Sequence, residues 1–316
     1  MNTTTMTPAP MAATENTAKS EQVHRHWPTW GAMALCLLIW GVALILPQGW
    51  TAVQLAALVF ALTLHSSLSH EILHGGLFRK SWANSAVGIV QPGLFVPYLR
   101  FRALHLAHHR DESLTDPYDD PETNYLDPAV WLRLGVVPRA ILRFNNTLLG
   151  RMAIGPLIGM VYFLRSDLRR AAQGERDVVW HWLAHMPGTV LTLWLVDVST
   201  VSVWVYVAAC YGAMSVLRIR TFLEHRAYEK AQGRTVVIEG RGLLSFLFLN
   251  NNFHMVHHLH PKVAWYRLPA LYRAQRAQFL RCNDGYVYRS YGAVFARYFL
   301  RAKDPVAHPL WRGPRD

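Results

Sequence analysis

The stretch "TAVQLAALVFALTLHSSLSHEILHGG", residues 51–76, begins as an apolar segment and ends in histidines. Its uncharged first half is typical of a helix that crosses a membrane. Glycine and proline are absent until the final two residues, so we expect one continuous helix that extends beyond the membrane surface. Its polar end contains His70 and His74 in the order H-E-x-x-H, which formally matches the zinc motif of metalloproteases. Whether this helix serves a protease or another metal centre depends on the rest of the chain.

Four stretches contain no Lys or Arg and are almost wholly apolar, namely residues 30–46, 50–64, 178–196 and 201–217. Only 16% of the 316 residues are charged, against about 25% in soluble domains. Each stretch covers roughly 22–28 Å as a helix, close to the thickness of a hydrocarbon core. Short gaps join the stretches in pairs. The sequence therefore predicts an all-α integral membrane protein whose four transmembrane helices form two hairpins, at about 30–46, 50–74, 178–196 and 201–220.

The basic residues are distributed unevenly. Of the 32 Lys and Arg, two lie in residues 1–29, thirteen in 75–177 and seventeen between 218 and the C-terminus. The positive-inside rule places these three segments, and both termini, on the cytoplasmic side of a cell membrane such as the bacterial inner membrane. The net charge of +12 therefore favours anionic lipid or an acidic protein partner over nucleic acid, for which we find no motif.

The predicted hairpins define the expected domain organisation. We expect a disordered tail over residues 1–29, one membrane domain over 30–280 with a cytoplasmic helical cap, and a cytoplasmic C-terminal tail over 281–316. Two apolar segments between the hairpins, residues 85–99 and 152–164, are interrupted by Gly or Pro and short for spans. We expect them to lie at the membrane surface or to re-enter it.

Nine of the sixteen histidines occur in patterns that suit metal binding. The patterns are HxxxH (His70, His74), two copies of HxxHH (His105, His108, His109 and His254, His257, His258) and a separate His225. Residues i, i+3 and i+4 share one face of a helix. Adjacent histidines diverge by about 100° and can reach two different ions. Neutral imidazole suits Fe, Zn, Cu and Ni.

The size of this set favours two metal ions over one. A single zinc takes three or four protein ligands, which would leave most of the nine histidines unexplained. The predicted topology places all of these patterns on the cytoplasmic side, where four pieces of chain can converge over the mouth of the bundle. We predict that the nine histidines are metal ligands, and we predict no other catalytic residue.

The remaining histidines have more ordinary interpretations. His65 and His260 flank the clusters, and we expect them to be structural more often than metal-binding. His181 and His185 also form HxxxH, early in the third span. No second motif surrounds this pair, so a polar contact between helices is favoured over a metal site.

Several acidic residues stand beside the predicted ligands. The run "DESLTDPYDDPE", residues 111–122, has the composition of a solvated turn-forming loop. Alternatively, Asp111 or a neighbour orients a ligand imidazole. Glu71 and Glu224 are placed to do the same. Glu71 would be the general base of a protease, but on a helix it points about 100° away from His70.

With these motifs the chain resembles the membrane fatty acid desaturase and hydroxylase superfamily, whose members carry three histidine boxes around a di-iron centre. The resemblance covers roughly residues 30–275. It rests on "SHEILHGG" (69–76), "HLAHH" (105–109) and "NNNFHMVHHLHPKVAWYRLPAL" (250–271). "TFLEHRA" (221–227) is similar to the region where many members provide an extra histidine, here His225. Some relatives use an Asn four residues earlier, where this chain has Thr221.

The resemblance implies activation of O2 by two iron ions and attack on an unactivated C–H bond of a lipid-like substrate. It implies a separate electron donor, such as an acidic ferredoxin, because no electron-transfer segment is fused to the chain. We favour desaturation of a fatty acyl chain on a lipid or a carrier. A hydroxylase or ketolase acting on a lipid, a carotenoid or a small metabolite is the alternative. A membrane zinc metalloprotease and a metal carrier are more remote alternatives.

Overall fold

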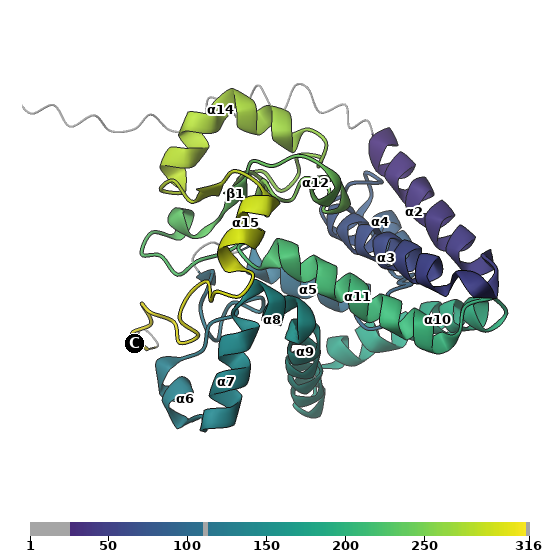
Figure 1. Ribbon diagram of the computed structural model, residues 1–316, viewed down its shortest axis with the longest axis horizontal. Helices are drawn as coiled ribbons and strands as arrows, with labels where there is room; N and C mark the ends of the chain where they lie inside the picture. Colours follow the sequence, from purple (N-terminus) through teal and green to yellow (C-terminus); the bar gives the residue numbers. More distant parts are fainter. Residues whose placement is uncertain (1–25, 110–112, 314–316) are drawn as a thin grey trace, which may run out of the picture.

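The structure, a computed structural model, describes residues 26–109 and 113–313. Most of the expected N-terminal tail therefore lies outside the described residues. The described chain is predominantly helical, which confirms the predicted class. Its only named strands are β1 (Val237–Ile238) and β2 (Val287–Tyr288), which pair in parallel. The long helices occupy one side of the molecule, and the shorter C-terminal elements lie over their ends (Figure 1).

Two packed helices occupy the residues of the first predicted pair of spans. α2 (Trp27–Ile45) is joined through the short helix η1 (Gln48–Trp50) to α3 (Thr51–Leu73), and the two long helices lie side by side (Figure 1). α3 is continuous, as its lack of internal Gly and Pro predicts. Both are long and apolar enough to cross a membrane, with mean hydropathies of 1.8 for Trp27–Ile45 and 1.5 for Gln48–Leu73.

The third and fourth predicted spans are also helical. They form α10 (Arg176–Asp197) and α11 (Val203–Thr221). In the described part of the chain, however, only α2 and α3 meet the length and hydropathy expected of a membrane span. The histidines and tryptophans of α10, and the two arginines in the last turn of α11, lower their hydropathy. α11 packs mainly against α3 and makes only slight contact with α10.

The other helices are short, apart from α9 and α14. They are α4 (Ser81–Gly88), α5 (Tyr98–His108), α6 (Pro128–Arg133), α7 (Val136–Asn145), α8 (Leu148–Ala153), α9 (Gly155–Ala172), η3 (Ala231–Arg234), α12 (Leu243–Leu247), α13 (His254–Leu259), α14 (Leu268–Cys282) and α15 (Tyr291–Tyr298). The apolar segment 85–99 contains a loop between α4 and α5, in which Leu94 has a φ of 62°. The apolar segment 152–164 joins α8 to α9.

The largest buried cluster lies where the end of α3 meets the C-terminal half of the chain. Leu68 and Ile72 of α3 belong to the same cluster as Leu223, Phe248 and Val294. Leu68 is 0% exposed, and burial of a leucine side chain stabilises a fold by about 1.5–3 kcal/mol. This core holds the histidine-bearing end of α3 against the elements that carry the later histidines.

A buried ion pair fixes the helix that carries the second histidine box. The Arg100 guanidinium, on α5, donates to both carboxylate oxygens of Asp167, on α9, at 2.6–3.1 Å. The indole N–H of Trp182, on α10, donates to the same carboxylate at 2.9 Å. The side chains of Arg100 and Asp167 are only 3% and 4% exposed. The pair therefore ties α5 to two other helices through one carboxylate.

Replacing Arg100 with methionine is expected to destabilise the protein by about 3–5 kcal/mol, because Asp167 is left as a buried charge without its cation. Thermal unfolding in detergent measures the effect. The matched control is Arg170→Met, which breaks the exposed pair with Glu175 and should change the midpoint little. Equal midpoints for the two variants would contradict the importance of the buried pair.

Candidate metal centre

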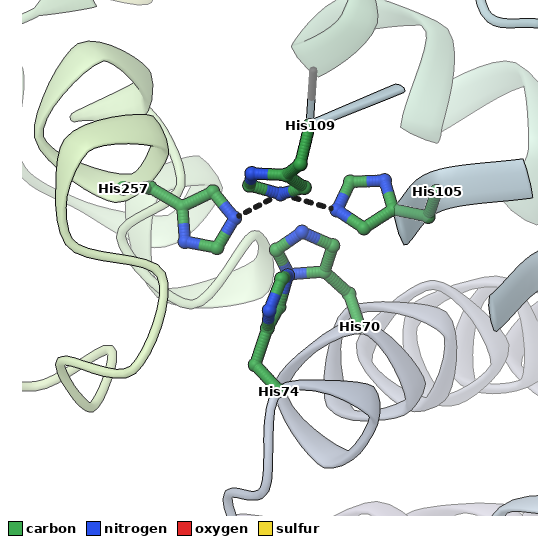
Figure 2. A group of neighbouring side chains, drawn as sticks. All are labelled: His70, His74, His105, His109 and His257. Carbon is green, nitrogen blue, oxygen red and sulfur yellow. Dashed lines mark hydrogen bonds between the residues drawn. The ribbon is translucent and has the colours of Figure 1, made fainter. Parts of the chain in front are cut away.

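The first histidine group brings together five imidazoles from three regions of the chain (Figure 2). Its members are His70, His74, His105, His109 and His257. One ring nitrogen from each lies within 4.8 Å of those of the others. The first two come from α3 and its C-terminal cap, the next two from α5 and its C-terminal cap, and the last from α13. This arrangement of five convergent nitrogens can hold one metal ion.

The second histidine group contains the other four predicted ligands. Its members are His108, His225, His254 and His258, and their ligand nitrogens also lie within 4.8 Å of one another. The two adjacent pairs in the HxxHH motifs are divided between the groups, so that His108 and His109 serve different groups, as do His257 and His258. The divergence of neighbouring side chains on a helix thus separates two sites from one short motif.

The ring nitrogens face one another across each group, as ligands of a shared ion would. In the first group Nε2 of His109 lies 3.0 Å from that of His105 and 3.2 Å from that of His257 (Figure 2). In the second, Nε2 of His225 lies 2.9 Å from that of His108 and 3.1 Å from that of His254. Pairs of imidazoles at these distances compete for one proton, whereas a central cation accepts every lone pair.

Two buried nitrogens provide an independent test of this fit. Nε2 of His70 and Nε2 of His74 are buried, and neither has a hydrogen-bond partner among the described residues. A buried polar atom without a partner costs about 1–3 kcal/mol. A metal ion in the first group would accept a lone pair from both atoms. The first group therefore fits a transition-metal ion of the kind that imidazole binds.

Carboxylates hold two of the ligand rings in one orientation. Nδ1 of His105 donates to Glu122 at 2.9 Å, and Nδ1 of His108 donates to Asp120 at 2.7 Å. Because an ionised carboxylate only accepts, Nδ1 carries a proton in both rings and Nε2 faces the group. The functional alternative for residues 111–122 is thus realised geometrically by Asp120 and Glu122, while Asp111 lies outside the described residues.

Neutral polar groups contact two histidines of the second group. Nδ1 of His254 lies 3.1 Å from Oδ1 of Asn251, and Nδ1 of His225 lies 3.2 Å from the hydroxyl of Thr235. Neither partner could be predicted from the sequence, because an Asn or Thr carries no distinctive spacing. Asn251, in the "NNNFH" run immediately before His254, was the nearest available signal.

Burial and neighbouring charges keep three histidines of the C-terminal half of the chain in the neutral form that binds metals. Burial, together with the charges of neighbouring histidines, holds the pKa values of His225, His254 and His257 well below the usual value. These imidazoles are therefore neutral near pH 7. For His108, burial also lowers the pKa, but the carboxylates of Glu122 and Asp120 outweigh it and raise the pKa to about 9. Without a metal, His108 therefore carries a proton on Nε2 as well as on Nδ1 near pH 7. An ion that binds Nε2 must displace the proton there.

The two glutamates beside predicted ligands have different roles. Glu71 accepts a hydrogen bond from the backbone N–H of Trp265 at 3.3 Å and so ties α3 to the segment after α13. Glu224 lies 3.7 Å from Nδ1 of His254 and 3.0 Å from the guanidinium of Arg220. Glu224 therefore stands behind a member of the second group, whereas Glu71 is engaged elsewhere.

The histidines with ordinary interpretations lie outside both groups, namely His65, His181, His185 and His260. His185 hydrogen-bonds the carbonyl of Leu94 at 2.7 Å, so its polar contact is with the loop between α4 and α5. The eight histidines of the three motifs and the separate His225, in contrast, are all members of the two groups.

Comparison with known families agrees with this arrangement. A protein-family model described as fatty acid desaturase matches residues 47–291, more than three quarters of the chain. The chain belongs to the fatty acid desaturase family. No curated protein matches this desaturase-family chain. The matched range contains every member of both histidine groups and ends before the last part of the sequence. With its two apolar helices, membership of the family indicates a membrane oxidoreductase.

Proposed function

We propose that this desaturase-family protein is a membrane-bound, O2-dependent di-iron oxidoreductase that desaturates a fatty acyl chain carried by a lipid or an acyl carrier. The observation that carries the proposal is the division of nine imidazoles into groups of five and four. A single metal ion would leave one group without a purpose. Family membership favours iron among the ions that imidazole binds.

The proposal assigns each iron to one group. His70, His74, His105, His109 and His257 would hold one ion, and His108, His225, His254 and His258 the other. Bound iron supplies the oxidation of the C–H bond by O2. The protein supplies neutral imidazoles, which Asp120 and Glu122 orient through Nδ1. It also supplies burial, since His105, His108 and His254 are at most 2% exposed.

A protease and a metal carrier fit the structure less well. The general base of an H-E-x-x-H protease would be Glu71, whose carboxylate is hydrogen-bonded to Trp265. Only His70 and His74 belong to that motif, although seven further histidines complete the two groups. A carrier would need ligands along the spans, and His181 and His185 are the only candidates in α10.

We further propose that α2, α3, α10 and α11 all cross the membrane, with both termini and the histidine groups on the cytoplasmic side. The support is the apolar surface of α10, which exposes large side chains such as Trp180, Leu183, Val190 and Trp194. Exposed tryptophan and leucine on a long helix suit contact with lipid. Labelling of single cysteines checks the topology: residue 199 should react from outside the cell and residue 79 should not.

The electron donor is proposed to be a separate acidic protein that binds the face formed by α14 and its flanking turns. This segment exposes Lys262, Arg267, Arg273, Arg281 and Arg289, while Arg276 pairs with Glu239. Between residues 262 and 289 the single acidic residue is Asp284. A surface of one charge sign accelerates association with a partner of the opposite sign.

Reversing two charges on this face, Arg273→Glu with Arg281→Glu, is expected to slow electron transfer from an acidic ferredoxin about 10-fold or more at low salt. The rate should approach that of the wild type as salt screens the interaction. Stopped-flow reduction of the iron centre measures the effect. The control is Arg79→Glu with Lys80→Glu, an exposed pair in the turn after α3. A similar loss in this control would contradict the assignment of the docking face.

Product analysis tests the proposed reaction. Lipids and metabolites of a host that expresses the wild-type chain should contain acyl chains with a new double bond, in amounts that depend on O2. His257→Ala should produce none, because it removes a member of the first group. Hydroxylated or ketone products would instead identify the protein as a hydroxylase or ketolase. Purified protein that contains only zinc and makes no oxygen-dependent product would overturn the proposal.

A further inference from the structure

The last part of the chain, residues 299–311, is bound to the loops that support the second histidine group. We call this segment the C-terminal strap. The backbone N–H of Leu126 donates to the carbonyl of Val306 at 2.9 Å, and the N–H of His308 donates to the carbonyl of Leu126 at 2.8 Å. At its start, the carbonyl of Phe299 accepts from the N–H of Leu149 at 2.9 Å. The strap lies beyond the range of the family match.

Lys303 connects the strap directly to a member of the second group. Its side chain is only 10% exposed, and its ammonium group donates a hydrogen bond to the backbone carbonyl of His225. The carboxylate of Asp304 lies 3.5 Å from the same ammonium. Burial of a cation costs several kcal/mol unless polar partners surround it. The carbonyl of His225 is therefore one of the groups that stabilise the buried ammonium of Lys303. The same hydrogen bond fixes the position of that carbonyl.

A second chain of hydrogen bonds runs from the strap to His108. Nδ1 of His308 accepts from the N–H of Leu310 at 3.1 Å, so its Nε2 carries the proton and donates to the hydroxyl of Thr115 at 3.2 Å. The N–H of Thr115 donates to Oδ2 of Asp120 at 2.9 Å. The other oxygen of Asp120 accepts from Nδ1 of His108 at 2.7 Å. Three of these links are buried.

One further contact joins the two connections. The Tyr125 hydroxyl donates to Asp304 at 2.5 Å and accepts from the N–H of Ala227, two residues after His225, at 2.9 Å. The strap therefore contacts the loop after the second histidine box and the turn that carries His225. These connections reach His225 and His108, and both are members of the second group.

We propose that the C-terminal strap is a positioning element for the second metal, acting through Lys303 on His225 and through His308 on His108. The inference rests on the proposed function in one respect, that the two groups bind two ions. Lys303 and His308 are positioning residues, because neither contributes a nitrogen to a histidine group. Weakening the strap should release the ion of the second group and leave the ion of the first group bound.

Binding of Co²⁺ to the metal-free full-length protein tests this proposal without any catalytic assay. Lys303→Met retains most of the side-chain volume and removes the ammonium group, while Asp304, which is 28% exposed, keeps the hydrogen bond from Tyr125. Wild-type protein should bind about two Co²⁺ per chain. In the variant the dissociation constant of one ion should rise about 10–100-fold, the range for lost supporting contacts, and the other should be unchanged. Arg301→Met, an exposed change in the same strap, should bind both ions normally.

His308→Phe examines the second connection and is expected to weaken the same single ion. Normal binding of both ions in Lys303→Met and His308→Phe would overturn the proposal. Weakening of both ions together with a lower unfolding temperature would also overturn it, because it would indicate a general role in folding. Wild-type protein that binds fewer than two ions would instead count against the di-iron proposal, so the two failures are distinguishable.

Discussion

Replacing His109 with alanine is expected to abolish product formation and to lower bound iron from about two ions per chain toward about one. Nε2 of His109 lies within 3.2 Å of ligand nitrogens on both His105 and His257. Its loss therefore opens the first group near its centre. The second group has no member in common with the first, so its ion should remain. Iron content by mass spectrometry and product yield by gas chromatography measure the two effects.

The matching change in the second group is His254→Ala. It should also abolish activity and remove about one ion, because catalysis in the proposed site needs both irons. His181→Ala is the control, since this histidine belongs to neither group, and it should keep both ions and full activity. Retention of activity by either ligand variant would contradict a two-metal centre. Loss of both ions from each variant would indicate a single coupled site rather than two separable ones.

Replacing Asp120 with asparagine is expected to weaken metal binding at the second group by about 10–100-fold. The carboxylate accepts the Nδ1 proton of His108 at 2.7 Å and so fixes the ring with Nε2 toward the group. Asparagine keeps the shape but is a weaker, neutral acceptor, so the imidazole becomes a poorer donor to the metal and its tautomer is less defined.

The matched control is Asp119→Asn, an exposed carboxylate in the same loop whose side chain faces solvent. Titration of the metal-free protein with Co²⁺, compared between the two variants, measures the difference. Activity in Asp120→Asn should fall with the loss of the weaker ion and recover in part at high iron concentration. Equal affinities in the two variants would show that the carboxylate does not support His108.

The helical class and the first two apolar helices could be predicted because their signals are local. α3 follows from an apolar run that continues without Gly or Pro into the histidines, and the structure contains it as Thr51–Leu73. The second pair of helices was found at the expected residues, but their packing was not predictable. α11 packs more extensively against α3 than it does against α10. Helix packing depends on which side chains meet across the bundle.

The candidate site also has parts that the sequence predicts and parts that only the folded chain reveals. Spacing in sequence singled out eight of the histidines, and the place of His225 beyond the fourth predicted span added the ninth; the structure gathers these nine into two groups. The acidic run 111–122 favoured a solvated loop, and only the folded chain shows that Asp120 is 4% exposed behind His108. The contact of Glu71 with Trp265 spans 194 residues of sequence. No periodicity along the chain carries information of that kind.

The sequence by itself determined the helical class, the apolar helices and the identity of the nine histidines, because hydropathy and helical spacing are properties of neighbouring residues. Only the tertiary structure decided which imidazole joins which group, which carboxylates orient them and that Lys303 holds the carbonyl of His225. His108 and His225, for example, are 117 residues apart, yet their Nε2 atoms lie 2.9 Å from each other. Such contacts arise when separate helices pack around one buried core, and the core is assembled from the whole chain.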